Sequence, residues 1–381
     1  MIPNKIIYVG MYDIPNKNFK RFYSLAAINK MNYIINLLNE NGVDVNIFSN
    51  SKIKEEKLRY YPEERISINK HNTLYLTPSI GCQNKLLKGI RIIINWIWLI
   101  LKILKHTKKN DTIIIYHTLE SIIPLLIIKK IRKIKYILEV EEIYSQMPHI
   151  SSRYKKLEQK LIQESDCYIT VSDTLKKILP HKPCISIYGN YRQKSINVTN
   201  KKSNSNTIIR LVFTGSIDKI RGAFTAVKSL EFLPPHYQLY ITGVGSSETI
   251  NEIKHEINRI NELKGSNICK YLGMLNQSEY DNLLKSADIA LNPQINGDYS
   301  KYLFPSKIIQ YLCYNLPVVT TKGESIIESP FAKILYFSED FTPKSFAEAI
   351  CKVQIGNSNY RQYLDTIHSE LLIEIKNLIS F

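Results

Sequence analysis

Apolar positions along the chain follow two alternating patterns. Short apolar runs, such as residues 6–9 and 112–116, are followed by stretches with apolar residues at helical spacing, such as residues 24–39. The short runs predict buried strands, and the periodic stretches predict amphipathic helices. Regular alternation of the two is typical of parallel βαβ units. We therefore expect an α/β protein.

This alternation occurs as two series, one in each half of the chain. The first predicts strands at 6–9, 43–48, 112–116, 136–140 and 167–171 and helices at 24–39, 86–104, 120–130 and 174–179. The second predicts strands at 208–213, 238–242, 268–272, 289–292 and 318–320 and helices at 223–230, 249–263, 278–286 and 306–313. Each series indicates a doubly wound sheet.

A polar stretch separates the two series. Residues 190–207 are rich in Asn, Ser and Lys and lack periodicity, which is typical of a linker. We predict a first domain at 1–190 and a second at 207–359, with a last helix at about 360–381 that packs back on the first. Open parallel sheets bind ligands at the carboxyl ends of their strands. Two Rossmann-like domains would therefore leave an interdomain cleft at those ends.

Charge is divided unevenly between the halves. The chain of 381 residues has a net charge of +17, and residues 1–190 hold 30 Lys and Arg against 16 Asp and Glu. Residues 191–381 hold 21 and 18. A basic first half points to an acidic partner, either nucleic acid or an anionic membrane surface. A coding bias toward Lys, Asn, Ile and Tyr is the alternative cause.

One predicted helix in the basic half suits a membrane surface. Trp96 and Trp98 lie in the apolar run 92–101, which is too short to span a bilayer. Basic residues stand at its ends: Lys85, Lys88, Arg91, Lys102 and Lys105, with the run 129–135 (KKIRKIK) beyond them. This pattern favours a helix lying on an anionic membrane with Trp at the interface. A helix buried against the sheet, with its basic ends in water, is the alternative.

The six cysteines have no C-x-x-C spacing and no nearby His partners, so neither a zinc site nor a disulfide framework is expected. The start of the chain lacks the pattern of a signal peptide. We expect a protein of the reducing cytoplasm.

Candidate anion-binding loops lie in the second half. The run 211–215 (LVFTG) ends in Gly215 and leads through residues 216–222 (SIDKIRG) into a helix. A strand-to-helix turn directs backbone N–H groups and the positive end of the helix dipole at an anion, and Arg221 would add a charge-assisted contact. Gly243 ends the next strand, and Ser306 and Lys307 begin a later helix after Pro305. Plain loops and a capped core helix are the alternative interpretations.

In order and spacing, these motifs resemble the family 4 glycosyltransferases of the GT-B fold. The resemblance covers about residues 165–325. It rests on residues 167–173, 211–215, 221–222, 240–243, 271–273 with 286–288, and 304–312 with 316–319. It implies transfer of a sugar from a nucleoside diphosphate sugar, bound mainly by the second domain, to an acceptor held by the first.

The resemblance also implies roles for single residues of the donor domain. Arg221, Lys307 and Ser306 match positions that face the diphosphate, and Gln310 matches the position that bonds the ribose. Tyr271 and Leu272 match the strand end beside the nucleobase, and Gly215, Ser216 and Gly243 belong to the loops around the same nucleotide.

Two positions depart from the family pattern. The family's pair of acids falls on Tyr302 and Gln310, and a frequent basic residue is replaced by Ser216. An amide still bonds a ribose hydroxyl. The chain has no Asp-x-Asp motif, so we expect no metal and no cofactor, with Arg221 and Lys307 neutralising the leaving phosphate. An inactive partner subunit is the alternative that these departures raise.

In the first domain, polar residues follow two predicted strands. His117 comes after 112–116, and Glu139, Glu141 and Glu142 lie at the end of 136–140. The resemblance suggests His117 near the donor sugar, and we choose Glu141 to contact an acceptor hydroxyl, with Asp13 as a weaker candidate. A hydrogen-bonded structural role for His117 and a solvated loop for the Glu cluster are the alternatives.

The function that follows is a retaining glycosyltransferase of surface polysaccharide biosynthesis, such as capsule or lipopolysaccharide O-antigen. It would act on a lipid-linked or growing glycan at the inner face of a bacterial plasma membrane, without nucleic acid as a partner. A nucleotide-sugar epimerase of the same fold and a basic nucleic-acid-binding protein are the alternatives.

Overall fold

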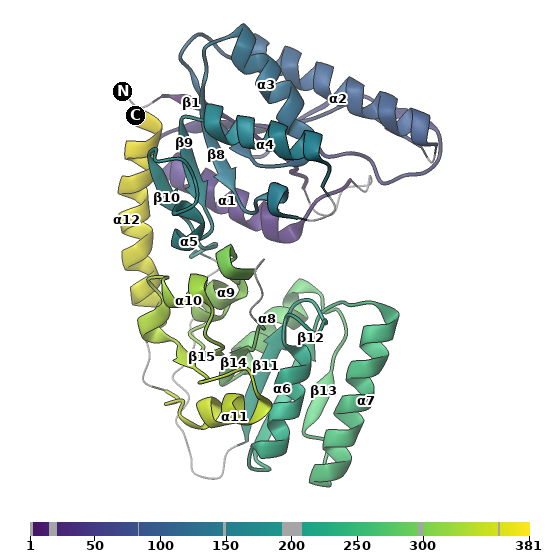
Figure 1. Ribbon diagram of the computed structural model, residues 1–381, viewed down its shortest axis with the longest axis vertical. Coiled ribbons are helices and arrows are strands. Elements are labelled where there is room, and N and C mark those ends of the chain that lie inside the picture. The colour runs from purple at the N-terminus through teal and green to yellow at the C-terminus, as the bar shows by residue number, and fades with distance from the viewer. Residues whose placement is uncertain are drawn as a thin grey trace. The chain divides into compact units, whose positions relative to one another are not determined.

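The computed structural model describes residues 3–14, 21–82, 84–147, 150–192, 208–295, 300–356 and 359–381 (Figure 1). The chain divides into two compact units. The first comprises Met1–Gly189 together with Ser369–Phe381, and the second comprises Asn190–His368. Most of the sequence-predicted linker, at 193–207, lies outside the described residues.

The first unit is built on an eight-stranded sheet of order β10-β9-β8-β7-β1-β2-β5-β4. All neighbours pair in parallel except β4 and β5. The strands are β1 Lys5–Gly10, β2 Asp44–Ser49, β4 Glu64–Ser67, β5 Asn72–Leu76, β7 Thr112–Tyr116, β8 Lys135–Val140, β9 Cys167–Thr170 and β10 Cys184–Ser186. Strand order reverses between β1 and β7, as in Rossmann-like sheets.

Helices cover this sheet, and α3 contacts both α2 and α4. They are α1 Leu25–Glu40, α2 Lys85–His106, α3 Ile122–Ile131, α4 Ser152–Glu164 and α5 Asp173–Lys176, with short turns η1 Leu119–Ser121 and η2 Tyr144–Gln146. Helix α1 begins at Ser24, whose side chain accepts from the Ala27 N–H, and ends at the Asn41-Gly42 pair that the sequence marks as a stop. The antiparallel pair β3 Arg59–Tyr61 and β6 Ser79–Gly81 lies in a stretch for which no strands were predicted.

The second unit holds a six-stranded parallel sheet of order β13-β12-β11-β14-β15-β16. Its strands are β11 Ile209–Thr214, β12 Tyr237–Thr242, β13 Cys269–Tyr271, β14 Ile289–Asn292, β15 Val318–Thr320 and β16 Tyr336–Phe337. Its helices are α6 Ala223–Ser229, α7 Ser247–Lys264, α8 Gln277–Ser286, α9 Lys307–Cys313, α10 Glu324–Ile327 and α11 Pro343–Cys351, with turns η3 Leu230–Phe232, η4 Ser300–Tyr302 and η5 Ala332–Ile334. The order reverses between β11 and β14.

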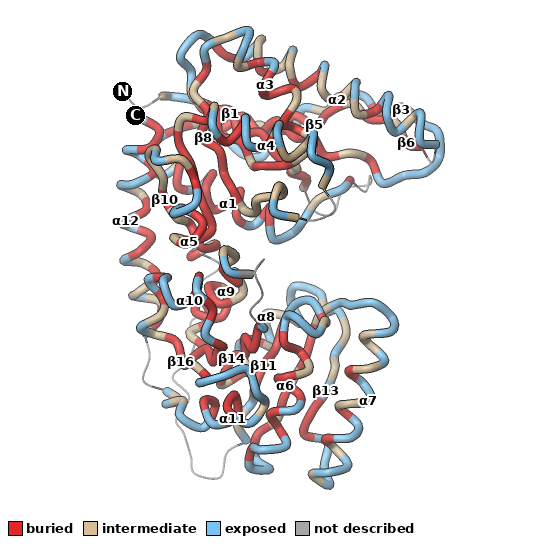
Figure 2. The backbone as a smooth tube through the Cα atoms, in the orientation of Figure 1, coloured by how far each residue is buried: buried red, intermediate tan, exposed pale blue. Residues whose placement is uncertain are grey.

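Burial follows the strands in both units (Figure 2). In the second unit Leu211, Phe213 and Ile241 of the central strands pack with apolar residues of α6, α7 and α11. The last helix, α12 Tyr360–Ser380, contributes to both units, since the division falls between His368 and Ser369. The predicted α/β fold with two Rossmann-like sheets is confirmed. Among the described residues, no helix has the length and apolarity needed to cross a membrane.

Candidate active site

Two loops meet where the strand order of the second sheet reverses. The loop after β11 runs from Gly215 to Gly222, and the chain after β14 begins at Pro293. The Ile295 N–H donates to the carbonyl of Ile220 at 2.9 Å, which ties the two loops together. Such a reversal point is the usual ligand site of an open parallel sheet.

Two glycines allow backbone to pack directly on backbone here. Gly222 has φ +86, and a Cβ atom there would lie 1.9 Å from the carbonyl oxygen of Pro293. Gly243 has φ +148, and its Cβ would lie 1.7 Å from the carbonyl oxygen of Gly215. Any side chain would push these loops apart, so glycine fixes their spacing. The Tyr271 hydroxyl also donates to the Gly243 carbonyl at 2.8 Å.

In the second unit, the charge of Arg221 affects the pKa of Lys307. Lys307 at the start of α9 is half-buried, and its ammonium lies 4.1 Å from the centre of the Phe213 ring. Burial, and then the charge of Arg221, lowers the pKa of Lys307 to about 7, while the charge of Asp218 opposes the shift. Arg221 is exposed, and its backbone N–H donates to Asp218 Oδ1 at 2.5 Å. Because burial and then the Arg221 charge disfavour the charged form of Lys307, an anion bound beside both cations would stabilise that form.

Gln310 lies one turn along α9 from Lys307 and ends a chain of hydroxyl groups. Its Oε1 accepts from the Tyr280 hydroxyl at 2.8 Å, and that hydroxyl lies 3.1 Å from Thr214 Oγ1. The Tyr311 hydroxyl accepts from the Thr214 N–H at 2.9 Å and lies 3.0 Å from Thr214 Oγ1, to which it can donate. One consistent direction of donation runs from Tyr311 through Thr214 and Tyr280 to Gln310. Because this fixes Oε1 as an acceptor, the Gln310 amide nitrogen is left to donate, and it has no hydrogen bond to another described residue.

The remaining donor candidates lie at the same edge of the second sheet. Ser216 and Ser306 are exposed, and the Ser306 side chain makes no capping hydrogen bond to α9. Leu272, directly after β13, is 38% exposed, which leaves an apolar side chain available to a ring. Tyr302, where the family pattern has an acid, is half-buried at the end of η4.

In the first unit, His117 is enclosed by protein. Its side chain has no exposed surface, and Nδ1 lies 3.2 Å from the carbonyl oxygen of Glu142. Its Nε2 lies 3.3 Å from Glu158 Oε1, but without the geometry of a hydrogen bond. Burial lowers the pKa of His117 to about 4, so the ring is neutral at physiological pH. The Glu158 carboxylate accepts from the backbone N–H groups of Tyr144 and Ser145 instead.

The acidic cluster at the end of β8 is divided between two partners. Glu141 is half-buried and forms an ion pair with Lys30 of α1. Glu139 is fully buried and accepts from the Tyr8 hydroxyl of β1, and burial together with the charge of Glu141 raises its pKa well above the usual range. Asp13 is 2% exposed and accepts from the Ile14 N–H. Of Glu139, Glu141 and Asp13, Glu141 has the most exposed side chain.

Sequence reasoning missed Asp218, Lys30 and the Tyr280–Thr214–Tyr311 chain. Asp218 lies within the loop 216–222 and could have been found as the acid nearest Arg221. The other residues carry no local signal, because they reach the site from distant elements. Among the described residues, no group of three or more His, Cys, Asp and Glu is arranged to hold a metal ion.

Comparison with known proteins gives a family match for part of the second unit and a fold for the whole chain. Residues 208–354, which contain every donor-site candidate above, match the family model described as "Glycosyl transferases group 1". No curated protein matches the chain.

Solved structures match over nearly the whole chain. The protein described as "Trehalose-6-phosphate from E. coli bound with UDP-2-fluoro glucose" has a TM-score of 0.64 at 11% identity, covering 98% of this chain and 96% of its own. Sucrose-phosphate synthase from Thermosynechococcus elongatus has a TM-score of 0.65 at 13% identity, covering 98% of both chains. The lipopolysaccharide outer core galactosyltransferase WaaB has 0.58 at 12%, covering 91% and 88%. At these identities the matches show the shared GT-B fold.

Proposed function

We propose that this glycosyltransferase of the GT-B fold uses a nucleoside diphosphate sugar held by its second unit. The observation that supports the donor class is the pair of cations, Arg221 and Lys307, at the reversal point of the second sheet. A diphosphate carries two or more negative charges, and binding it would offset both the burial of Lys307 and its repulsion from Arg221. The family match over residues 208–354 supports the same class.

The proposed binding mode uses the rest of the site. The diphosphate contacts Arg221, Lys307 and Ser306, with the backbone of Gly215, Ser216 and Gly243 close by. The free amide nitrogen of Gln310 donates to a ribose hydroxyl, and the base packs by Tyr271 and Leu272. An amide in place of a carboxylate still supplies one hydrogen bond, so Gln310 is compatible with donor binding.

In the proposed transfer, the bond between the anomeric carbon and the diphosphate oxygen breaks, and a bond to the acceptor oxygen forms. The acceptor proton passes to the departing phosphate oxygen on the same face, which retains the configuration, and the nucleoside diphosphate leaves. Arg221 and Lys307 stabilise the charge that develops on the phosphate, and we expect no metal to be required. Glu141 is the proposed contact for the acceptor hydroxyl, and His117 is proposed near the donor sugar. Because His117 is buried and neutral, it would act as a fixed dipole and not as an acid.

We propose a lipid-linked or growing glycan as the acceptor, in the synthesis of a surface polysaccharide such as capsule or lipopolysaccharide. One solved structure of the same fold is a lipopolysaccharide outer core galactosyltransferase, which supports an acceptor of this kind. Such an acceptor would hold the protein at the inner face of the plasma membrane.

A thermal-shift panel tests the donor site. Purified protein is heated with UDP, GDP, CDP, dTDP or CMP, all with EDTA, and with a short DNA duplex. Binding to the folded state raises the melting temperature, so one nucleoside diphosphate is expected to shift it and to identify the base. Arg221→Ala should abolish the shift. Lys219→Ala should keep it, because this exposed lysine of the same loop already pairs with Glu252. No response to any nucleotide, with a salt-sensitive response to DNA, would refute the donor site.

A further inference from the structure

We infer that the outer face of α2 inserts into the surface of an anionic lipid bilayer. The face, called here the α2 stripe, consists of Leu86, Ile90, Ile93, Ile97 and Leu101. The inference goes beyond the proposed function, because the stripe belongs to the first unit and takes no part in donor binding. It rests on the distribution of polar and apolar residues around the helix and on the charge beside it.

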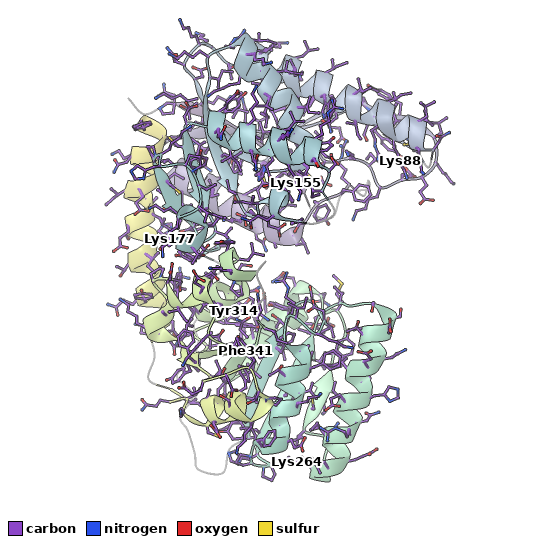
Figure 3. All side chains as sticks on the ribbon, in the orientation of Figure 1. Lys88, Lys155, Lys177, Lys264, Tyr314 and Phe341 are labelled. Carbon is purple, nitrogen blue, oxygen red and sulfur yellow. The ribbon has the colours of Figure 1, made fainter. Side chains whose placement is uncertain are left out.

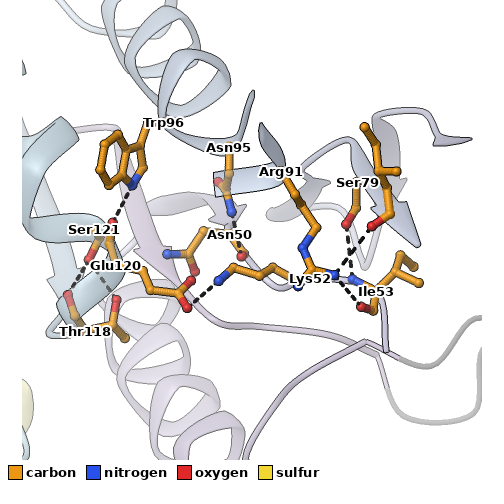
Figure 4. Close-up of polar contacts among 11 residues, drawn as sticks. Asn50, Lys52, Ile53, Ser79, Arg91, Asn95, Trp96, Thr118, Glu120 and Ser121 are labelled. Carbon is orange, nitrogen blue, oxygen red and sulfur yellow. Dashed lines mark hydrogen bonds and ion pairs between the residues drawn. The ribbon is translucent and has the colours of Figure 1, made fainter. Parts of the chain in front are cut away.

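The inner face of α2 is unusually polar for a helix packed on a sheet. Arg91 is 8% exposed and donates to the carbonyls of Ile53 at 3.2 Å and Ile80 at 3.4 Å. Asn95 is 5% exposed and donates to the carbonyl of Asn50 at 3.0 Å. Figure 4 shows these side chains directed from the helix toward the loop after β2 and strand β6. The polar groups of α2 are therefore held by the protein.

Both tryptophans belong to this inner side, which corrects the expectation that they lie at a membrane interface. Trp98 is 7% exposed, and its Nε1 donates to Glu63 at 2.9 Å. Trp96 is half-buried and donates to the carbonyl of Glu120 at 2.8 Å (Figure 4). Lys102 forms an ion pair with the same Glu63. The indole N–H groups thus fix the orientation of α2 on the unit.

The outer face is apolar along its length. The exposed fractions are 72% for Leu86, 40% for Ile90, 52% for Ile93, 53% for Ile97 and 62% for Leu101. Their spacing of three or four residues places them on one side of the helix, over about 22 Å of its axis. A helix that buries Arg and Asn and exposes Ile and Leu is inverted relative to a surface helix in water. Such a contiguous apolar surface marks an interaction site.

Charge around the stripe favours an anionic membrane as the occupant. Residues 84–135 contain twelve Lys and Arg but only two acidic residues, Asp111 and Glu120. Lys85, Lys88, Lys105 and Lys109 are exposed and have no ion pair with another described residue; Figure 3 labels Lys88 on α2. Apolar residues bordered by lysine are typical of helices that lie in the plane of a bilayer surface. A second copy docked stripe to stripe would bring the same lysines together, which opposes that alternative.

Vesicle co-sedimentation of the full chain tests the inference. Wild type should bind vesicles of phosphatidylethanolamine with phosphatidylglycerol and bind phosphatidylcholine vesicles weakly. Ile93→Gln/Ile97→Gln should weaken partition into the anionic vesicles by about tenfold or more, since two apolar side chains lose their insertion. Leu263→Gln/Ile373→Gln is the matched control, because these residues of α7 and α12 are 56% and 64% exposed and lie outside the stripe. The control should bind as wild type.

Three results would overturn the inference. One is absence of binding by wild type to both kinds of vesicle. Another is equal binding by the stripe variant and wild type with loss of both in high salt, which would mean adsorption through lysine alone. The third is a wild-type dimer in solution that the stripe variant converts to monomer. Because Arg221→Ala should bind vesicles normally, failure of the donor site and failure of this surface are separable.

Discussion

At the scale of a single residue, we expect Lys307 to couple the proposed donor binding to pH. Its pKa of about 7 in the free protein should rise toward the ordinary 10.5 when a diphosphate binds, because the anion favours the charged form. Above pH 7, binding therefore takes up a proton, and the affinity for UDP or the preferred nucleotide should fall by up to about tenfold per pH unit. The terminal phosphate, with a pKa of about 6, is already ionised in this range.

Titration calorimetry between about pH 7 and pH 9, in two buffers of different ionisation enthalpy, measures both the affinity and the proton uptake. The folding stability of the unliganded protein should change in the opposite direction and increase with pH. The unfolded chain binds more protons than the folded one between the two pKa values, so this group adds stability as pH rises. Lys307→Ala should bind weakly at every pH, without proton uptake. An affinity of wild type that does not change with pH would contradict the role of Lys307.

At the residue scale, the sequence indicated candidate charged and polar side chains, but not the residues that surround them in the folded protein. Arg221, Lys307 and Gln310 were proposed from local signals, namely strand-end glycines and a Pro-Ser-Lys helix start. The enclosure of His117 depends on Glu158 and on the carbonyl of Glu142, which are distant or carried by backbone. No pattern near residue 117 contains that information.

At the scale of elements, the loop after β11 depends on the absence of a side chain at Gly222. Gly222→Ala combines a positive φ with a contact of 1.9 Å to the Pro293 carbonyl, so we expect a loss of about 3 kcal/mol or more and loss of nucleotide binding. Gly265→Ala is the control, since Gly265 has φ +63 but open space around its Cβ position. It should cost only about 1 kcal/mol. Urea unfolding measures both, and equal costs would show that the loop moves away from Pro293 without penalty.

Helix α2 shows why the residue range of a helix is easier to predict than which of its faces packs against the protein. Residues 86–104 were predicted as helical, and the structure has Lys85–His106. Two sets of positions share helical spacing, one with Arg91, Asn95 and Trp98 and the other with Leu86, Ile93 and Ile97. Hydropathy alone assigns the aliphatic set to the core. The structure reverses this, because Asn50, Glu63 and Glu120 supply partners for the polar set.

At the scale of the whole molecule, the alternation of short apolar runs with amphipathic helical stretches predicted both parallel sheets. Most of the strands lie where these apolar runs placed them. Strands β3 and β4 were missed because they are short and polar, with only Tyr61 buried in β3 and none of β4 fully buried. Strand β5 was missed as well, although four of its five residues are buried. Charge is concentrated in one unit. The first unit holds 31 Lys and Arg against 18 Asp and Glu, and the second holds 20 against 16. The basic unit carries the α2 stripe, and the nearly balanced unit carries the proposed donor site.

The first unit is completed by the end of the chain, which leads to a stability prediction. Within Ser369–Phe381, Leu371, Ile375 and Leu378 are buried, and the Asn41 side chain at the end of α1 donates to the Leu372 carbonyl at 3.1 Å. Ile375→Ala leaves a cavity at a fully buried position and should cost about 2–4 kcal/mol. Ile373→Ala, two residues away and 64% exposed, should cost less than about 0.5 kcal/mol.

Urea unfolding of the full chain measures the difference, and nucleotide binding by Ile375→Ala below its transition checks that the second unit keeps its fold. Equal stability of the two variants would mean that the last turns of α12 are not part of the first unit. If Ile375→Ala loses both stability and nucleotide binding, the two units unfold together. Loss of stability with nucleotide binding intact would show that the end of the chain stabilises the basic unit alone, although the whole second unit, Asn190–His368, lies between them in the sequence.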